Sequence, residues 1–289
     1  MNIFYFPCNN LGDLFNIYIA IYYGFNYKSV KLNKKNWTGI NNDNGIFLIG
    51  SILKYCGTNS KIMGVGFKHE FENDENKTLV QNNDILYVRG KFTKKLLLTM
   101  DKEKEYNLEK IKIFEPGLLL STFMKPNNFP QKNILIIPHN SHLDLLMNLD
   151  TNINLLSLMF KNEEYNFITK GENNQKIIKI FEEKFSIINK YEIIFSSSLH
   201  GLCFAIALNK KFVWFKMNNH DEPAFKYLDF FSYFNKDIKC LDLSKLILDN
   251  KLDLNLSKIN DYINYIDVSE YKDEIKNFEK ELLQIKNLL

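Results

Sequence analysis

The chain has 289 residues, 45% of them hydrophobic and 25% charged, a balance typical of a globular protein with room for two ordinary domains. Its 37 basic and 34 acidic residues leave a net charge of +3, so charge predicts no nucleic-acid partner. No apolar stretch reaches the roughly 18 residues of a membrane span, and residues 1–7 lack the features of a signal peptide. The four cysteines are scattered without a CxxC pair, which favours reduced thiols in the cytoplasm over disulfides or a zinc site.

The first half of the chain predicts buried strands that end in small or charged residues. A strand over residues 2–7, a turn over 9–13 and a helix over 14–23 ending at Gly24 are typical of the opening of an α/β domain. Further strands are expected over 45–51, 61–67 and 85–90, followed by a helix over 92–100. Because ligands bind beyond the carboxyl ends of parallel strands, the ends of these strands are the expected site region.

Arg89, at the end of one of these strands, is the only arginine in the sequence. Its planar guanidinium can bind a carboxylate or phosphate at two points, which lysine cannot do. The sequence therefore predicts a functional role for Arg89, against the simpler reading that one arginine has survived by chance.

The second half predicts a new α/β unit. Residues 121–132 hold two prolines and several polar residues, the best linker candidate. Strands are expected over 134–139, 152–158 and 211–216, and helices over 175–189 and from 221 to about 234. From residue 257 the chain is expected to form surface helices that pack back across the domains.

Residues 192–208 are the most informative stretch. The run 193–195 predicts a buried strand, three serines form a polar turn, and a helical pattern follows with His200 in its first turn. A serine hydroxyl can cap the free amides of a helix start, and those amides with the helix dipole attract phosphate or carboxylate. An imidazole beside a bound anion is a candidate acid or base, although serines before a helix are often simple caps.

Seven short motifs, in order, resemble those of the polysaccharide pyruvyl transferase family. They are Asn10-Leu11-Gly12-Asp13 with Asn16, Gly50-Ser51-Ile52-Leu53, Gly64-Val65-Gly66, Val88-Arg89-Gly90 with Thr93, Glu115-Pro116-Gly117-Leu118-Leu119, Ile137-Pro138-His139, and Ser197-Ser198-Leu199-His200-Gly201-Leu202. The resemblance implies two Rossmann-like domains facing a cleft, as in GT-B glycosyltransferases. Residues 1–122 would be the acceptor side and carry Arg89. Residues 131–289, including the C-terminal helices, would be the donor side and carry His200.

The resemblance also implies an activity, the transfer of pyruvate from phosphoenolpyruvate to a sugar of a bacterial capsule, exopolysaccharide or lipooligosaccharide. We expect no cofactor or metal, only a small-molecule donor and a glycan acceptor, and a position peripheral to a surface-glycan assembly complex. His200 is the expected acid, and Arg89 its catalytic and donor-binding partner. The donor-binding set is completed by Ser197, Ser198, Leu199 and Gly201. Binding at the cleft rim is expected of Asn10, Gly12, Asp13, Gly50, Ser51, Gly66, His139 and Glu222, with a lysine near Lys94 or Lys216 adding charge.

Three departures from the family pattern keep alternatives open. Glu115 stands where the family often has aspartate, Ser198 stands where many members have arginine, and the chain is short. A nucleotide-sugar glycosyltransferase of the same architecture could use the helix start for a diphosphate and Glu222 for a ribose. A non-enzymatic scaffold in a capsule assembly complex is a further reading. His139, His142 and Asp144 could also share a metal ion.

Overall fold

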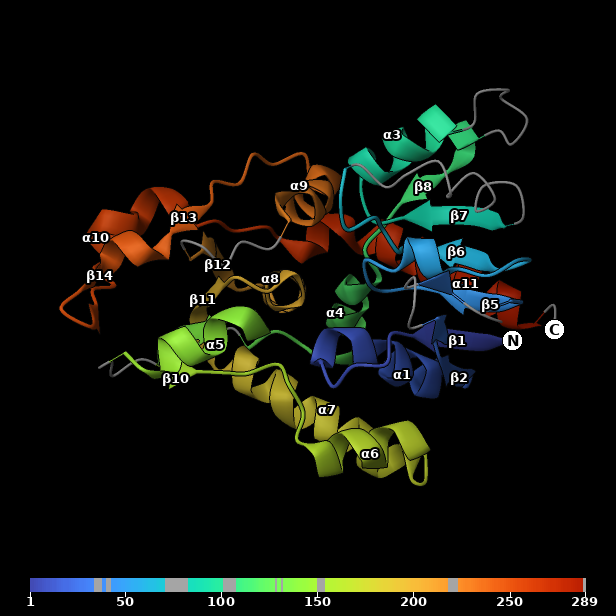
Figure 1. Ribbon diagram of the computed structural model, residues 1–289, viewed down its shortest axis with the longest axis horizontal. Helices are drawn as coiled ribbons and strands as arrows, with labels where there is room; N and C mark the ends of the chain where they lie inside the picture. The colour runs from blue at the N-terminus through green and yellow to red at the C-terminus, as the bar shows by residue number, and fades with distance from the viewer. Residues whose placement is uncertain are drawn as a thin grey trace. The chain divides into compact units, whose positions relative to one another are not determined.

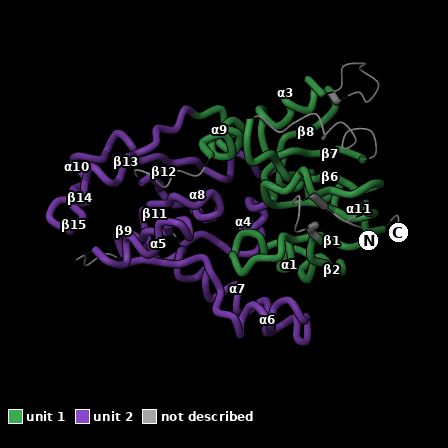
Figure 2. Tube along the Cα trace, in the orientation of Figure 1, with its two compact units in different colours: residues 1–116, 223–236, 273–289 green, residues 117–222, 237–272 purple. Residues whose placement is uncertain are grey.

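The structure is a computed structural model that describes residues 1–33, 38–39, 43–70, 83–100, 108–127, 129–130, 132–149, 154–217 and 223–287. The chain divides into two units, shown in two colours in Figure 2. Unit 1 comprises residues 1–116, 223–236 and 273–289, and unit 2 comprises residues 117–222 and 237–272. This division differs from the expected domains, because two later segments of the chain join the first unit.

Unit 1 is built on a parallel sheet of six strands in the order β2-β1-β5-β6-β7-β8. The strands are β1 (Asn2–Tyr5), β2 (Asn26–Ser29), β5 (Gly45–Phe47), β6 (Lys61–Met63), β7 (Asp84–Val88) and β8 (Lys112–Ile113). A small hairpin, β3 (Leu32–Asn33) with β4 (Thr38–Gly39), lies outside this sheet. The order reverses at β1, with β2 on one side and β5 on the other. In open parallel sheets, ligands bind outside the carboxyl ends of the strands at such a reversal.

The described α-helices of unit 1 are α1 (Leu11–Tyr23), α3 (Lys91–Met100), α9 (Ala224–Tyr233) and α11 (Lys272–Asn287), the last assigned to this unit from Asp273 on (Figure 1). Helix α1 begins at the Asn10 cap and ends at Gly24, whose φ of 69° favours glycine. Helix α11 packs on the sheet through Phe278. The centroid of its ring lies 4.4 Å from the ring centroid of Phe114 and 5.0 Å from that of Tyr87. The C-terminal helix expected at the surface therefore contributes to the core of unit 1.

Unit 2 repeats the same strand order in a parallel sheet of five strands, β10-β9-β11-β12-β13. The strands are β9 (Lys132–Ile137), β10 (Asn154–Leu155), β11 (Tyr191–Ser196), β12 (Lys211–Lys216) and β13 (Leu241–Asp242). Here the order reverses at β9, between β10 and β11. The central strands are apolar and buried, as expected for a sheet covered on both faces.

The helices of unit 2 are α4 (Leu120–Phe123), α5 (Asn140–Met147), α6 (Asn162–Lys170), α7 (Asn174–Asn189), α8 (Leu199–Ala207) and α10 (Leu256–Ile259). A hairpin of β14 (Ile247–Leu248) and β15 (Lys251–Leu252) completes the unit. Helix α7 buries Ile177, Phe181 and Phe185, the inward face that its periodicity predicts. Both units therefore confirm the α/β class with parallel sheets.

Candidate functional site

His200 lies at the carboxyl edge of the unit 2 sheet, on the first turn of α8. Strand β11 ends at Ser196 and α8 begins at Leu199, so only Ser197 and Ser198 separate them. The His200 side chain is half-buried, and its ring lies 6.4 Å from the ring of Phe204, one turn further along the helix. The strand, turn and helix predicted from the sequence are thus confirmed here, and they place an imidazole beside the positive end of a helix.

The serine turn is held by a hydrogen bond other than the expected cap. Ser198 occupies the N-cap position, but its side chain makes no capping hydrogen bond. Instead the buried Ser196 hydroxyl accepts from the Ser198 N–H at 3.0 Å and lies 2.7 Å from the carbonyl oxygen of Ile137 on β9. Gly201 lets this hydroxyl approach, because a Cβ there would lie 2.3 Å from Ser196 Oγ. The serine at the N-cap position therefore does not cap the helix through its hydroxyl, as serines before a helix were expected to do.

Two further histidines join this edge through Ser197. The Ser197 hydroxyl accepts from the His139 backbone N–H at 2.9 Å and lies 2.8 Å from Nδ1 of His142, which is 2% exposed. The His139 side chain caps α5, since its Nδ1 accepts from the Ser141 N–H at 3.3 Å. The structure thus links the loops after β9 and β11 at the strand reversal of unit 2. His142 was considered from the sequence only as a metal ligand, and its contact with Ser197 could not be read from spacing.

The predicted residues of unit 1 lie at the equivalent edge of its own sheet. Asn10 accepts from the Gly12 N–H at 2.8 Å and so starts α1, which carries Asp13 in its first turn. The half-buried Asp13 accepts from the Cys8 thiol at 3.2 Å. Burial, reinforced by the Asp13 carboxylate, raises the pKa of the Cys8 thiol, so the sulfur keeps the proton that it donates.

The loops after β5 and β6 meet at this edge. Gly50 has a φ of +123°, a conformation that favours glycine, and a Cβ there would lie 3.5 Å from Asp13 Oδ1. The Gly66 N–H donates to the Gly50 carbonyl oxygen at 3.1 Å. Asp13 and Gly50 therefore lie side by side where the strand order of unit 1 reverses.

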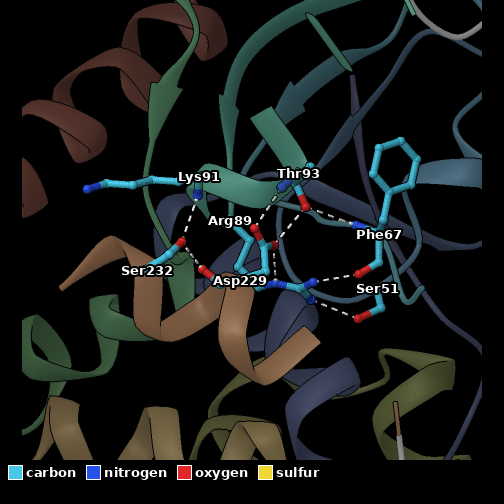
Figure 3. Close-up of polar contacts among 7 residues, drawn as sticks. All are labelled: Ser51, Phe67, Arg89, Lys91, Thr93, Asp229 and Ser232. Carbon is cyan, nitrogen blue, oxygen red and sulfur yellow. Dashed lines mark hydrogen bonds and ion pairs between the residues drawn. The ribbon is translucent and has the colours of Figure 1, made fainter. Parts of the chain in front are cut away.

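Arg89 follows β7 and is the centre of a buried polar network, shown in Figure 3. Its side chain is 1% exposed, and Nε pairs with Asp229 Oδ2 at 3.0 Å. Nη1 donates to Ser51 Oγ at 2.7 Å, and Nη2 donates to the Phe67 carbonyl oxygen at 2.6 Å. Three of the five guanidinium N–H groups thus donate to partners within unit 1, one of them the carboxylate of Asp229.

Asp229 comes from α9, which the chain reaches after passing through unit 2. Its carboxylate also accepts from the Thr93 N–H at 2.8 Å and the Thr93 hydroxyl at 2.7 Å (Figure 3). Two glycines make room for this packing. A Cβ on Gly66 would lie 2.7 Å from Arg89 Cζ, and one on Gly90 would lie 1.8 Å from the Asp229 carbonyl oxygen. Sequence reasoning missed Asp229, because no local signal joins residues 140 positions apart.

The remaining predicted residues are distributed as follows. Leu199 is a buried residue of α8, and Glu222 lies outside the described residues. Lys94 donates to the carbonyl oxygens of Glu109 and Ile111, whereas Lys216 is exposed at the end of β12. Over the described ranges, no three histidine, cysteine or acidic side chains are grouped as a metal site, and this includes His139, His142 and Asp144. Nor does any helix in those ranges have the length and apolarity needed to cross a membrane.

Comparison with known proteins gives one informative match. No curated protein matches the sequence significantly. A solved structure of a functionally uncharacterised protein from Klebsiella pneumoniae subsp. pneumoniae aligns at 11% identity, covering 81% of this chain and 87% of that one. Its TM-score of 0.42 is too low to support a conclusion about this chain. The sequence profile of the polysaccharide pyruvyl transferases, however, matches residues 10–219, from the loop after β1 to just beyond β12. The chain therefore belongs to the polysaccharide pyruvyl transferase family and is a transferase.

Proposed function

We propose that this transferase moves pyruvate from phosphoenolpyruvate to two hydroxyls of one sugar in a bacterial surface polysaccharide, forming a pyruvate ketal. Family membership supports a role in polysaccharide pyruvylation. The observation that carries the choice of donor is the position of His200, on the first turn of α8 where the strand order of unit 2 reverses. A small anion with a carbon to be protonated suits an imidazole beside the N–H groups of a helix start.

The reaction makes three demands on the protein. The methylene carbon of the donor must gain a proton, and the neighbouring carbon must then be attacked by a sugar hydroxyl. Phosphate must leave from that carbon, and the second hydroxyl must close the ketal. One of the two hydroxyl protons leaves with the phosphate, and the other restores the acid. The overall balance is donor plus diol giving ketal plus inorganic phosphate.

His200 is the proposed acid for the first step. A positioned general acid contributes typically about 10²–10⁴-fold in rate. The amides at the start of α8 would hold the phosphate or carboxylate, since the first helical N–H groups have no acceptor within the helix. Ser196 and Ser197 would contribute by fixing the turn that aims both groups, through the bonds that tie it to β9 and His142.

The test follows phosphate release with purified protein, phosphoenolpyruvate and a panel of cell-surface glycans, with mass spectrometry of the product. His200→Ala should lower turnover at least 100-fold. His69→Ala is the matched control, because His69 is exposed and belongs to unit 1. Near-normal turnover in His200→Ala would show that the acid is a different group.

Several finer expectations remain proposals. A surface-polysaccharide sugar as acceptor and a GT-B arrangement of the two units are predictions from the resemblance. The cytoplasmic location is a prediction from the cysteine spacing. The family match does not favour the nucleotide-sugar alternative. A thermal-shift comparison separates the two donors, because a bound ligand stabilises the folded protein in proportion to the logarithm of its concentration over its dissociation constant. Stabilisation by nucleotide sugars alone would overturn phosphoenolpyruvate as donor.

A further inference from the structure

The charges at the carboxyl edge of unit 1 differ from those that the sequence suggests. The lone arginine looks like an anion ligand, but Asp229 neutralises its charge at 3.0 Å in a setting where both side chains are at most 1% exposed. The carboxylate of Asp13, by contrast, is half-exposed at the strand reversal. A carboxylate repels a phosphate or a second carboxylate, so this edge is poorly suited to the anionic donor.

Arg89 instead acts on Ser51. Its Nη1 donates to Ser51 Oγ at 2.7 Å, so the Ser51 proton does not lie on that bond and can point to another acceptor. Donation from a charged guanidinium polarises the hydroxyl and makes it a stronger donor. Ser51 is half-buried, and the positive φ of Gly50 sets the turn from which it projects.

Ser51 and Asp13 therefore offer complementary polar groups on neighbouring loops. Asp13 lies beside Gly50, the residue before Ser51, and the two loops meet at the β1–β5 reversal. A carboxylate only accepts hydrogen bonds, while a polarised hydroxyl donates one. Sugar hydroxyls both donate and accept, so the hydroxyls of one sugar can bond both groups, whereas an anion satisfies only Ser51.

We infer that this edge of unit 1 binds hydroxyl groups of the sugar acceptor through Asp13 and Ser51, with Arg89 and Asp229 as positioning residues. The inference rests on the proposed function, because a pyruvate ketal requires a polyol acceptor. It reassigns Arg89 from donor ligand to a group that orients and polarises Ser51. The donor is left to the edge of unit 2 that carries His200.

The experiment compares Asp13→Asn, Ser51→Ala and Ser51→Thr with Ser232→Ala. Ser232 is a matched control because it bonds the Lys91 N–H and the Asp229 carbonyl oxygen without touching Arg89 (Figure 3). The dissociation constant for phosphoenolpyruvate is measured by calorimetry, the acceptor KM by phosphate release, and folding by thermal melts. Ser51→Ala and Asp13→Asn should raise the acceptor KM about tenfold. Donor affinity should stay within about twofold of wild type, and Ser51→Thr should restore much of the loss because it keeps the hydroxyl.

Two results would overturn the inference. A weaker donor affinity with an unchanged acceptor KM would make this edge the donor site, and unchanged values for both would make Ser51 purely structural. Saturation-transfer NMR with neutral methyl hexosides tests the edge without turnover. Asp13-dependent sugar binding in a protein that releases no phosphate would sustain the inference and count against the proposed reaction. Absence of sugar binding in the wild-type protein would count against the inference itself.

Discussion

Replacing Asp229 with asparagine tests whether the buried pair with Arg89 holds unit 1 together. The carboxylate accepts three hydrogen bonds, from Arg89 Nε at 3.0 Å, the Thr93 N–H at 2.8 Å and the Thr93 hydroxyl at 2.7 Å. Asparagine has nearly the same shape and can still accept from the Thr93 N–H. Its amide nitrogen, however, would face the Arg89 Nε–H, so two donors would oppose each other and the guanidinium would lose its counter-charge.

The expected loss of stability is large. Removing one partner of a buried ion pair costs about 3–5 kcal/mol, because the remaining charge stays buried without compensation. The free energy of unfolding of a folded domain is only about 5–15 kcal/mol, so the variant would lose much of the stability of unit 1. The double variant Arg89→Met with Asp229→Leu removes both charges and fills the space with apolar groups. It should be less destabilised than Asp229→Asn, since such replacements are often neutral.

Urea unfolding followed by circular dichroism measures the free energies, and hydrogen exchange of peptides from 84–100 and 223–234 locates the change in unit 1. Peptides from 191–207 in unit 2 serve as an internal reference. Asp84→Asn is the matched control, because the Lys61–Asp84 pair at 2.7 Å is 28% and 53% exposed and should contribute less than about 1 kcal/mol. A loss below about 1 kcal/mol in Asp229→Asn, or strictly additive effects of Arg89→Met and Asp229→Leu, would refute the reasoning.

Two further predictions concern packing and pH. Gly66→Ala would place a Cβ 2.7 Å from Arg89 Cζ, and we expect a loss of about 1–3 kcal/mol in urea unfolding; wild-type stability would mean that the guanidinium moves freely. Burial lowers the pKa of Lys210, which donates to the Asn127 carbonyl oxygen, to about 8. The pKa of Lys210 is therefore lower in the folded protein than in the unfolded chain. Above pH 8 the unfolded chain keeps the Lys210 proton to a greater extent than the folded protein does, so the free energy of unfolding rises with pH. From pH 8 to pH 10, the free energy of unfolding of the wild type should therefore increase relative to that of Lys210→Met. The exposed Lys211→Met should show no such trend, and a flat difference for Lys210→Met would contradict the lowered pKa.

The local elements of this chain were largely readable from its sequence. The strand–turn–helix around His200 was predicted because an apolar run, a polar turn and a helical period follow one another within seventeen residues. The sequence predicts the end of α1 at Gly24 because glycine readily adopts the left-handed conformation that ends many helices, and the structure shows this conformation there. The strands are shorter than expected: β5 ends at Phe47 and β6 at Met63, before the glycines that close each apolar run. An apolar run indicates which residues are buried, and the chain stays buried beyond the last hydrogen bond that joins neighbouring strands.

The partners of buried polar groups could not be read in this way. The Ser197–His142 contact joins residues 55 positions apart, and the Arg89–Asp229 pair joins residues 140 positions apart. Each depends on how strands are ordered in a sheet and on which unit a helix joins. Hydrophobic periodicity carries information about burial and helical phase but none about these pairings. The role expected for Arg89 depended on the assumption that a lone arginine faces solvent or ligand.

The sequence by itself determined that the chain alternates strands and helices, that glycines and polar residues gather after the strands, and that His200 begins a helix. These follow from short-range preferences of the backbone, which act within a few residues. Only the tertiary structure decided that α9 and most of α11 belong to unit 1, and that Arg89 is neutralised by Asp229 while Ser51 receives its hydrogen bond. A buried charge takes whichever counter-charge the fold brings within reach, and the order of residues along the chain does not specify that choice.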